Sequence, residues 1–380
     1  MKPLNCCIKV VLVLCMIFNV VYVVRAKSTD NIIIDNVTES YLMMPSKDGS
    51  SIEKIKANKE LVYTAQRVDE KAIAMQYYNS FVSIDKASAP DTKPVYFSAT
   101  DEGIFYDDSK VCGLNFNVKK GKNATVKFEQ TYLAPEYFTV INLSEVYYVK
   151  NKTVTITVPQ TFANKIKVVE KSFTPNITSH RSVGKKGETI YSFTVTDLDC
   201  FKREDSAPHI GTVVPRVYIC GSFANVNELY GYLHQYTTDA DAGIESVNTI
   251  AKDIVSACES DDERIAKLTR WVHKNIRYIA VEHGEYGQRP ELASEVLRKR
   301  YGDCKGMSSL LKAMLCAVGI DARLTWIGTD AIAHDWEEIP SIASGNHMIC
   351  SVVNGDSILY IDGTASYLPI GCYSPSIQGQ

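Results

Sequence analysis

The sequence lacks an excess of positive charge. Its 380 residues contain 41 Lys and Arg against 44 Asp and Glu, which gives a formal net charge of -3 at pH 7. Proteins that bind nucleic acids usually concentrate basic residues on one face or along one helix, so we expect no nucleic-acid partner. The hydrophobic fraction of 45% and the charged fraction of 22% are typical of a soluble globular protein. The length suits two domains preceded by an export signal.

The sequence also lacks the cysteine spacing of a metal site. Neither a CxxC pair nor a Cys/His cluster occurs among its 11 cysteines. The sequence therefore predicts no metal and no cofactor. The eight cysteines beyond residue 26 are spread irregularly, at Cys112, Cys200, Cys220, Cys258, Cys304, Cys316, Cys350 and Cys372. A small disulfide scaffold would space them closely and regularly, so most are expected to be small core residues.

A hydrophobic run long enough to span a membrane is missing as well. The apolar run over residues 10–24 is shorter than the roughly 20 residues of a spanning helix. Lys2 and Lys9 precede it, and the small Ala26 follows it at a suitable cleavage position. This pattern predicts a signal peptide over residues 1–26 and export to the periplasm or the exterior. The alternative is an uncleaved signal, which would be the only membrane contact.

Residues 31–220 are rich in β-branched and aromatic residues and are interrupted by turn signals. Clear alternation of apolar and polar residues occurs over residues 124–132, 152–158 and 189–196. Several such strands at short spacing predict an antiparallel β-sandwich. His180 and His209 lie in polar surroundings and are expected to have no chemical role.

The pattern changes after Gly221. We expect a helical linker over residues 221–245, an α+β domain over residues 246–370 and a tail over residues 371–380. In the α+β domain, Ser260 and Glu263 form a capping box for a helix that ends near residue 275, with His273 on its surface.

A second helix is predicted from Cys304 to Ala317, directly after a Gly-Asp turn. A thiol at a helix start feels the partial positive charge of the helix N-terminus, which favours the reactive thiolate. The unpaired amides of the first turn also suit an oxyanion. The sequence therefore predicts that Cys304 is a nucleophile, and the alternative is a small buried core residue.

A cysteine nucleophile needs a base, and the base needs a group that orients it. His347 begins one predicted strand and Asp362 ends the next, with a predicted two-residue turn at Asn354-Gly355. That turn would place His347 directly opposite Asp362, with their Cβ atoms within about 5.5 Å. The alternative is a weak ion pair at the surface.

Several segments resemble the core of the transglutaminase-like superfamily: residues 276–284, 293–305, 315–323, 346–349 and 360–364. The resemblance extends over residues 247–367 and is closest to exported bacterial proteins that carry a β-rich domain of unknown function, the DUF3857 type, before this core. Residues 38–218 resemble that β-rich domain more loosely, chiefly through residues 209–218.

The resemblance implies a papain-like arrangement with Cys304 as nucleophile, His347 as base and then acid, and Asp362 as the orienting group. Gln288 is implied as a candidate for the oxyanion or lid region, although the register there differs by one from the family, and Arg289 is the other choice. Gly306 replaces an acidic residue of the family pattern. Relatives also usually continue into a further β-rich region.

These features predict an exported cysteine enzyme that acts on amide bonds of a peptide, a protein or a cell-envelope polymer. We expect hydrolysis rather than transamidation, because nothing indicates a channel for an acceptor amine or a calcium site. A catalytically silent binding or assembly module that uses the β-sandwich is the alternative, and a lid role for the N-terminal domain is a third. His334 and Trp336, in the loop over residues 329–345, either line a cleft or cover the core.

Overall fold

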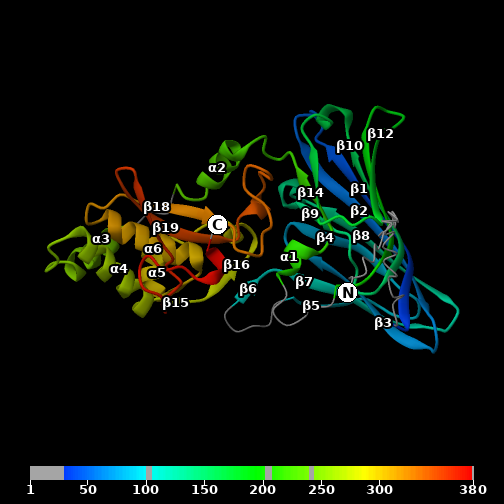
Figure 1. Ribbon diagram of the computed structural model, residues 1–380, viewed down its shortest axis with the longest axis horizontal. Helices are drawn as coiled ribbons and strands as arrows, with labels where there is room; N and C mark the ends of the chain where they lie inside the picture. Colours follow the sequence, from blue (N-terminus) through cyan, green and yellow to red (C-terminus); the bar gives the residue numbers. More distant parts are fainter. Residues whose placement is uncertain (1–29, 100–104, 202–207, 239–243, 379–380) are drawn as a thin grey trace, which may run out of the picture.

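The computed structural model describes residues 30–99, 105–201, 208–238 and 244–378. The predicted signal peptide over residues 1–26 lies outside the described residues. Within these ranges, no helix has both the length and the apolar character needed to cross a membrane. Figure 1 shows a β-rich region built from the first half of the chain beside a mixed region of helices and strands built from the second half. The predicted α+β class, with a β-rich N-terminal part, is confirmed.

A seven-stranded sheet forms the centre of the β-rich region, in the order β12-β13-β10-β1-β2-β8-β4. Its strands are β1 (Ile32–Pro45), β2 (Ile52–Ala65), β4 (Val82–Ser88), β8 (Asn123–Tyr132), β10 (Val149–Val158), β12 (Ile177–Val183) and β13 (Thr189–Leu198). Neighbouring strands are antiparallel except β1 and β10, which are parallel. Alternation of apolar residues is the same in both orientations, so the sequence pattern contained no signal for this parallel pair.

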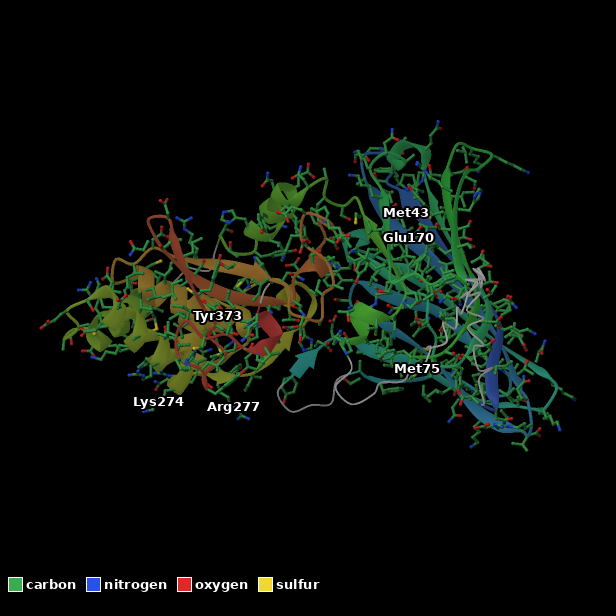
Figure 2. The ribbon with its side chains drawn as sticks, in the orientation of Figure 1. Met43, Met75, Glu170, Lys274, Arg277 and Tyr373 are labelled. Carbon is green, nitrogen blue, oxygen red and sulfur yellow. The ribbon has the colours of Figure 1, made fainter. Side chains whose placement is uncertain are left out.

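Two smaller sheets cover the apolar side of the large one. The first has the order β3-β7-β5, and the second has the order β11-β14-β9. Their strands are β3 (Glu70–Tyr78), β5 (Val95–Ser98), β7 (Lys110–Val118), β9 (Val140–Asn142), β11 (Lys167–Lys171) and β14 (Arg216–Cys220). Each small sheet closes its own hydrophobic cluster against the large sheet. Figure 2 labels Met43 of β1 and Met75 of β3, which lie in these two separate parts of the region.

Four ionisable side chains meet inside the β-rich region. The ammonium of Lys152, which is fully buried, lies 2.7 Å from Glu145 Oε1 and 3.0 Å from Glu39 Oε2. Lys59 Nζ lies 2.8 Å from Glu145 Oε1. Burial opposes the charge on Glu39, but Lys152 and Lys59 outweigh it and lower the pKa of this carboxyl to about 2. The two lysines and two glutamates, called here the Lys152 cluster, therefore balance one another's charge.

The second half of the chain packs around helix α6. The helices are α2 (Val226–His234), α3 (Glu245–Ile254), α4 (Asp261–Asn275), α5 (Ala293–Lys299) and α6 (Cys304–Cys316). The three-stranded antiparallel sheet is β18 (Ala322–Ile327), β19 (His347–Asn354) and β20 (Ser357–Ile361), in that order. Helix α6 packs against this sheet on one side and against α3, α4 and α5 on the other, and a single hydrophobic cluster joins them.

Short elements complete the described chain. They are η1 (Pro135–Tyr137), η2 (Gln160–Phe162), α1 (Ile210–Val213), β15 (Arg277–Tyr278), β16 (Ala280–Glu282), η3 (Gly284–Gly287), β17 (Tyr301–Gly302), η4 (Ile342–Ser344), η5 (Pro375–Ile377) and β6 (Phe105–Asp107). Strand β6 of the β-rich region pairs in parallel with β16 of the mixed region, as Figure 1 shows. This pair joins the two regions by backbone hydrogen bonds.

The predicted capping box at the start of α4 is half correct. Ser260 Oγ accepts a hydrogen bond of 3.2 Å from Glu263 N, as expected. The carboxylate of Glu263 instead accepts from Glu259 N, one residue before the cap, at 2.9 Å. Both bonds satisfy amide donors at the helix start, which is why the sequence pattern still located the helix correctly.

The predicted turn between β19 and β20 is wrong by one residue. The pairs Cys350–Ile361 and Asn354–Ser357 leave Gly355 and Asp356 as the turn residues. Gly355 has φ of 59° at the first turn position, where a type II′ turn places glycine, whereas an Asn-Gly type I′ turn would place it second.

The corrected turn moves the strand register by two residues. His347 is therefore not directly opposite Asp362, as the sequence predicted. Because side chains alternate between the two faces with a period of two, a shift of two leaves both residues on the same face as diagonal neighbours. The two side chains can still meet.

Candidate active site

Cys304 is the first residue of α6 and is buried, with 5% of its surface exposed. Asp303 caps the helix: its Oδ1 accepts a hydrogen bond of 2.8 Å from Gly306 N. Gly306 packs closely on α5, since a Cβ built there would lie 3.1 Å from Val296 Cγ2. Glycine at this position therefore lets α6 begin close to α5, and the Asp303 cap is intact.

Two contacts set the start of α6 against the sheet. Ser308 Oγ donates a hydrogen bond of 3.0 Å to the backbone oxygen of Met348, the residue after His347. Gly363, in the turn after β20, packs on the first turn of α6, where a Cβ would lie 3.5 Å from Met307. The helix start that carries Cys304 is therefore held beside the strand start that carries His347 and the turn that carries Asp362.

His347 and Asp362 form a direct contact. Nε2 of the half-buried His347 lies 3.1 Å from Oδ2 of the buried Asp362. The other carboxylate oxygen, Oδ1, accepts hydrogen bonds from Thr364 N at 2.9 Å and from Thr364 Oγ1 at 2.7 Å. Since a carboxylate accepts, Nε2 donates, and Nδ1 is left as the nitrogen that can exchange a proton with a thiol.

The electrostatics of this pair favour a charged imidazole. Burial opposes the charge on His347, but hydrogen bonds with Asp362 and Cys304, together with their negative charge, outweigh burial and raise the pKa of His347 to about 10. Burial likewise opposes the charge on Asp362, and the hydrogen bond with His347 outweighs it and lowers the pKa of the carboxyl. The three side chains are therefore coupled through hydrogen bonds and charge.

A buried lysine, Lys305, directly follows Cys304 in α6. Lys305 is 2% exposed and ion-pairs with Asp303 and with Glu282 of β16, the latter at 3.1 Å. Burial opposes its charge, but Asp303, Cys304 and Glu282 hold the pKa of the ammonium above its usual value. The sequence interpretation missed this lysine, and its only signal was its position directly after Cys304.

Tyr278 lies close to the same group. In β15 it is the register partner of Gly302, two residues before Cys304. Burial and the negative charges of Cys304, Asp303, Glu282 and Asp362 raise the pKa of its hydroxyl, which therefore keeps its proton near neutral pH. This protonated hydroxyl is the second group that the sequence interpretation missed.

His273 also reaches the site, although the sequence predicted a surface position. Its Nε2 lies 3.1 Å from the backbone oxygen of Asp362, 89 residues further along the chain. The side chain is half-buried, and the contact could not be predicted because helical periodicity identifies the apolar face of α4 but not the polar groups of a loop that packs against its edge.

Gln288, the predicted oxyanion or lid residue, follows η3 and is half-buried. No hydrogen bond within the described ranges joins its side chain to Cys304, His347 or Asp362. Arg289, the other choice, lines a cavity of about 220 Å³ with Asp303, Glu291 and several apolar residues. The structure thus brings Cys304, His347 and Asp362 together and leaves Gln288 outside this group.

In the loop over residues 329–345, Trp336 and His334 pack against other parts of the chain. The side chain of Trp336 packs with Ile342 and residues of α2 in a small hydrophobic cluster. The ring of His334 lies against Tyr218 of β14, with 4.7 Å between centroids, and its Nε2 contacts Ser344 Oγ at 3.0 Å. Burial lowers the pKa of His334 to about 4, so it is neutral at physiological pH.

The part of the chain that the structure describes contains no group of three or more His, Cys, Asp or Glu side chains arranged to hold a metal ion. Among the cysteines of the described ranges, Cys112, Cys220, Cys304 and Cys350 are buried, and Cys316 and Cys372 are exposed.

Comparison with known proteins places the mixed region in a defined class. Residues 248–347 match the model of the transglutaminase-like superfamily. This region therefore carries a transglutaminase-like core, and it contains Cys304 and His347. Asp362 lies 15 residues beyond the end of the match. No curated protein matches the chain.

Among solved structures, one described as a "putative protease" from Parabacteroides distasonis has a TM-score of 0.61 and 15% identity, over 87% of this chain and 67% of that chain. This likeness shows a shared fold across both regions. An M1 zinc metallopeptidase from Deinococcus radiodurans has a TM-score of 0.24 and 11% identity, over 43% of this chain and 39% of that chain. The latter score is too low to support an argument.

Proposed function

We propose that this chain is a cysteine enzyme that cleaves amide bonds through Cys304, His347 and Asp362. The observation that carries the proposal is the hydrogen-bonded series in which Asp362 holds His347 and His347 is coupled to the thiol at the start of α6. The transglutaminase-like match over residues 248–347 supports the reaction class. The fold shared with the structure from Parabacteroides distasonis that is described as a protease favours peptide bonds as the substrate.

In this mechanism the Cys304 thiolate attacks the amide carbonyl, and the negative charge moves to the carbonyl oxygen. Protonated His347 then gives its proton to the departing amine, and a thioester between Cys304 and the acyl group remains. His347 next removes a proton from water as the water oxygen attacks the thioester; the carbon–sulfur bond breaks, the acid leaves, and the Cys304 thiolate beside protonated His347 is restored. The amide of Cys304, at the start of α6, is a suitable donor to the oxyanion, whereas the amide of Gly306 already donates to Asp303.

Hydrolysis is preferred over transamidation because water is always available as the second nucleophile. The proposal includes export through residues 1–26 and a DUF3857-type identity for the β-rich region, with a peptide, a protein or a cell-envelope polymer as substrate. Cell fractionation of the full chain beside a variant that lacks residues 1–26 tests the export step. Recovery of both forms in the cytoplasm would contradict export.

The enzymatic proposal is tested by mass spectrometry of the protein after incubation with a library of thioester and activated-amide acyl probes. We expect an acyl adduct on Cys304, with a preference among the acyl groups that indicates the substrate. Cys304→Ala should abolish it. Cys316→Ala, which removes an exposed thiol at the other end of the same helix, should leave it unchanged. Equal labelling of all exposed cysteines and none of Cys304 would favour the silent binding module.

A further inference from the structure

Asp362 lies one residue beyond the end of β20, where pairing with β19 stops. The last register pair of β19 and β20 joins Cys350 to Ile361, and β20 ends at Ile361. The ladder therefore fixes the residue before Asp362 but not Asp362 itself. A carboxylate that must orient an imidazole needs a defined backbone position, and another element has to supply it.

Helix α4 supplies that contact through His273. Thr269 and His273 are four residues apart on α4, so they lie on the same side of the helix, and both line the small cavity that also contacts Asp362. His273 Nε2 lies 3.1 Å from Asp362 O. A carbonyl oxygen can only accept, so Nε2 carries a proton and donates it in this contact.

The same carbonyl accepts a second hydrogen bond from within its own turn, from Ala365 N at 3.3 Å. The carboxylate of Asp362 is bonded to His347 and to Thr364. The bonds with Thr364 and Ala365 move with the turn, whereas His273 belongs to a separate helix that is anchored in the core by Ile265, Leu268 and Val272. Gly363 packs on α6, but His273 is the contact from α4 that hydrogen-bonds the backbone of Asp362 itself to a fixed element.

We propose that His273 is a positioning residue for the reaction: it fixes the peptide of Asp362, which places the carboxylate on His347. This inference rests on the proposed function. A purely structural role, in which the hydrogen bond only joins α4 to the sheet, is the competing explanation. Both roles predict lower stability when the bond is removed, but only a positioning role acts through the carboxylate of Asp362.

The test compares His273→Met with His273→Gln in the full chain, because the two side chains have the same length and only glutamine keeps a donor near the Nε2 position. The readout is the rate of Cys304 alkylation by iodoacetamide across pH, measured well below the unfolding temperature. We expect His273→Met to lower the rate at neutral pH by about tenfold to a hundredfold, the range for a small misplacement of a reacting group. His273→Gln should recover most of it.

The decisive comparison repeats His273→Met in an Asp362→Ala background. A positioning residue should have no further effect there, since no carboxylate is left to place, whereas a structural residue should lower the rate by the same factor as before. Lys274→Met, an exposed neighbour on α4, is the control and should match wild type.

The outcomes separate this inference from the proposed function. If wild-type Cys304 reacts no faster than Cys316, the proposed function fails. If Cys304 is activated but His273→Met equals wild type, or has the same effect in both backgrounds, only the role of His273 is overturned. Failure of His273→Met to fold while His273→Gln folds and reacts normally would also assign the residue a structural role.

Discussion

The two regions of this protein both bury ionisable side chains, but they arrange them differently. The Lys152 cluster in the β-rich region pairs two lysines with two glutamates. The site at the start of α6 also has a buried lysine with its carboxylates, and in addition a thiol, an imidazole and the carboxylate of Asp362.

The difference lies in which groups meet. In the Lys152 cluster, pairing of opposite charges outweighs burial, so the pKa of Glu39 is lowered and that of Lys59 is raised. At the other site the pKa of His347 is raised as well, but this half-buried imidazole contacts a carboxylate and a thiol. Buried charge by itself indicates little about function, whereas an imidazole between a carboxylate and a thiol matches the arrangement of a base beside a nucleophile.

Of the substitutions that compare the two regions, removal of the His347 imidazole should have the largest effect on activity. We expect His347→Ala to slow acyl transfer to Cys304 by about 10²- to 10⁴-fold, the usual contribution of a general acid or base. Acylation followed by mass spectrometry measures this loss, and Lys152→Met should leave the rate unchanged. Equal losses in the two variants would mean that both clusters act only on the fold.

Removing Lys152 should lower the stability of the protein and leave its activity unchanged. Lys152→Met leaves Glu39 and Glu145 buried without their fully buried partner, which costs about 3–5 kcal/mol of unfolding free energy. Urea unfolding followed by circular dichroism measures it. As a control, Lys127→Met removes an exposed partner of Glu60 and should change stability by less than about 1 kcal/mol. Similar losses for the two lysines would contradict the importance of burial.

The two sites should respond to opposite ends of the pH scale. The folded pKa of His347, about 10, lies above its ordinary value of 6.5, so its stabilising contribution is complete below about pH 6.5 and is lost as the pH rises toward 10. The folded pKa of Glu39, about 2, lies below its ordinary 4.5, so its contribution is complete above about pH 4.5 and is lost as the pH falls toward 2.

Unfolding free energies measured from pH 2 to 10 check both limbs. We expect Asp362→Asn to flatten the alkaline limb and, because the pKa of this carboxyl is itself lowered, to remove part of the acid limb as well. Glu39→Gln should flatten the acid limb alone. An alkaline limb that is unchanged in Asp362→Asn, or flattened in Glu39→Gln, would show that the assignment of these groups is incorrect.

The smallest effect is expected at Gln288. No hydrogen bond in the described part of the chain joins its side chain to Cys304, His347 or Asp362, so Gln288→Ala should change the rate of Cys304 acylation by less than about threefold. Loss of a true oxyanion donor costs about 10²- to 10³-fold. A drop of that size in the acyl-probe assay would restore Gln288 to the site and would mean that the region after η3 moves when substrate binds.

Much of the site could be predicted because it depends on local pattern. Helix periodicity and the Gly-Asp turn located the start of α6 at Cys304. Alternation along β19 and β20 placed His347 and Asp362 on one face, and this survived an error in the turn because the error shifted the register by two residues and not by one.

Contacts between distant segments could not be predicted in this way. The parallel pairing of β1 with β10, the ion pair between Lys305 and Glu282, and the hydrogen bond from His273 to Asp362 join residues that no local pattern connects. Each depends on how separate elements pack, and the same amphipathic pattern permits several packings.

Short-range periodicity was thus sufficient for the α+β class, for the position of Cys304 at a helix start and for a shared face for His347 and Asp362. Tertiary packing decided which side chains the buried charges meet, how far Asp362 extends beyond its strand, and which helix holds it there. The physical reason is that periodicity records which face of an element is buried, whereas hydrogen bonds and ion pairs depend on distances between elements that only the folded chain sets.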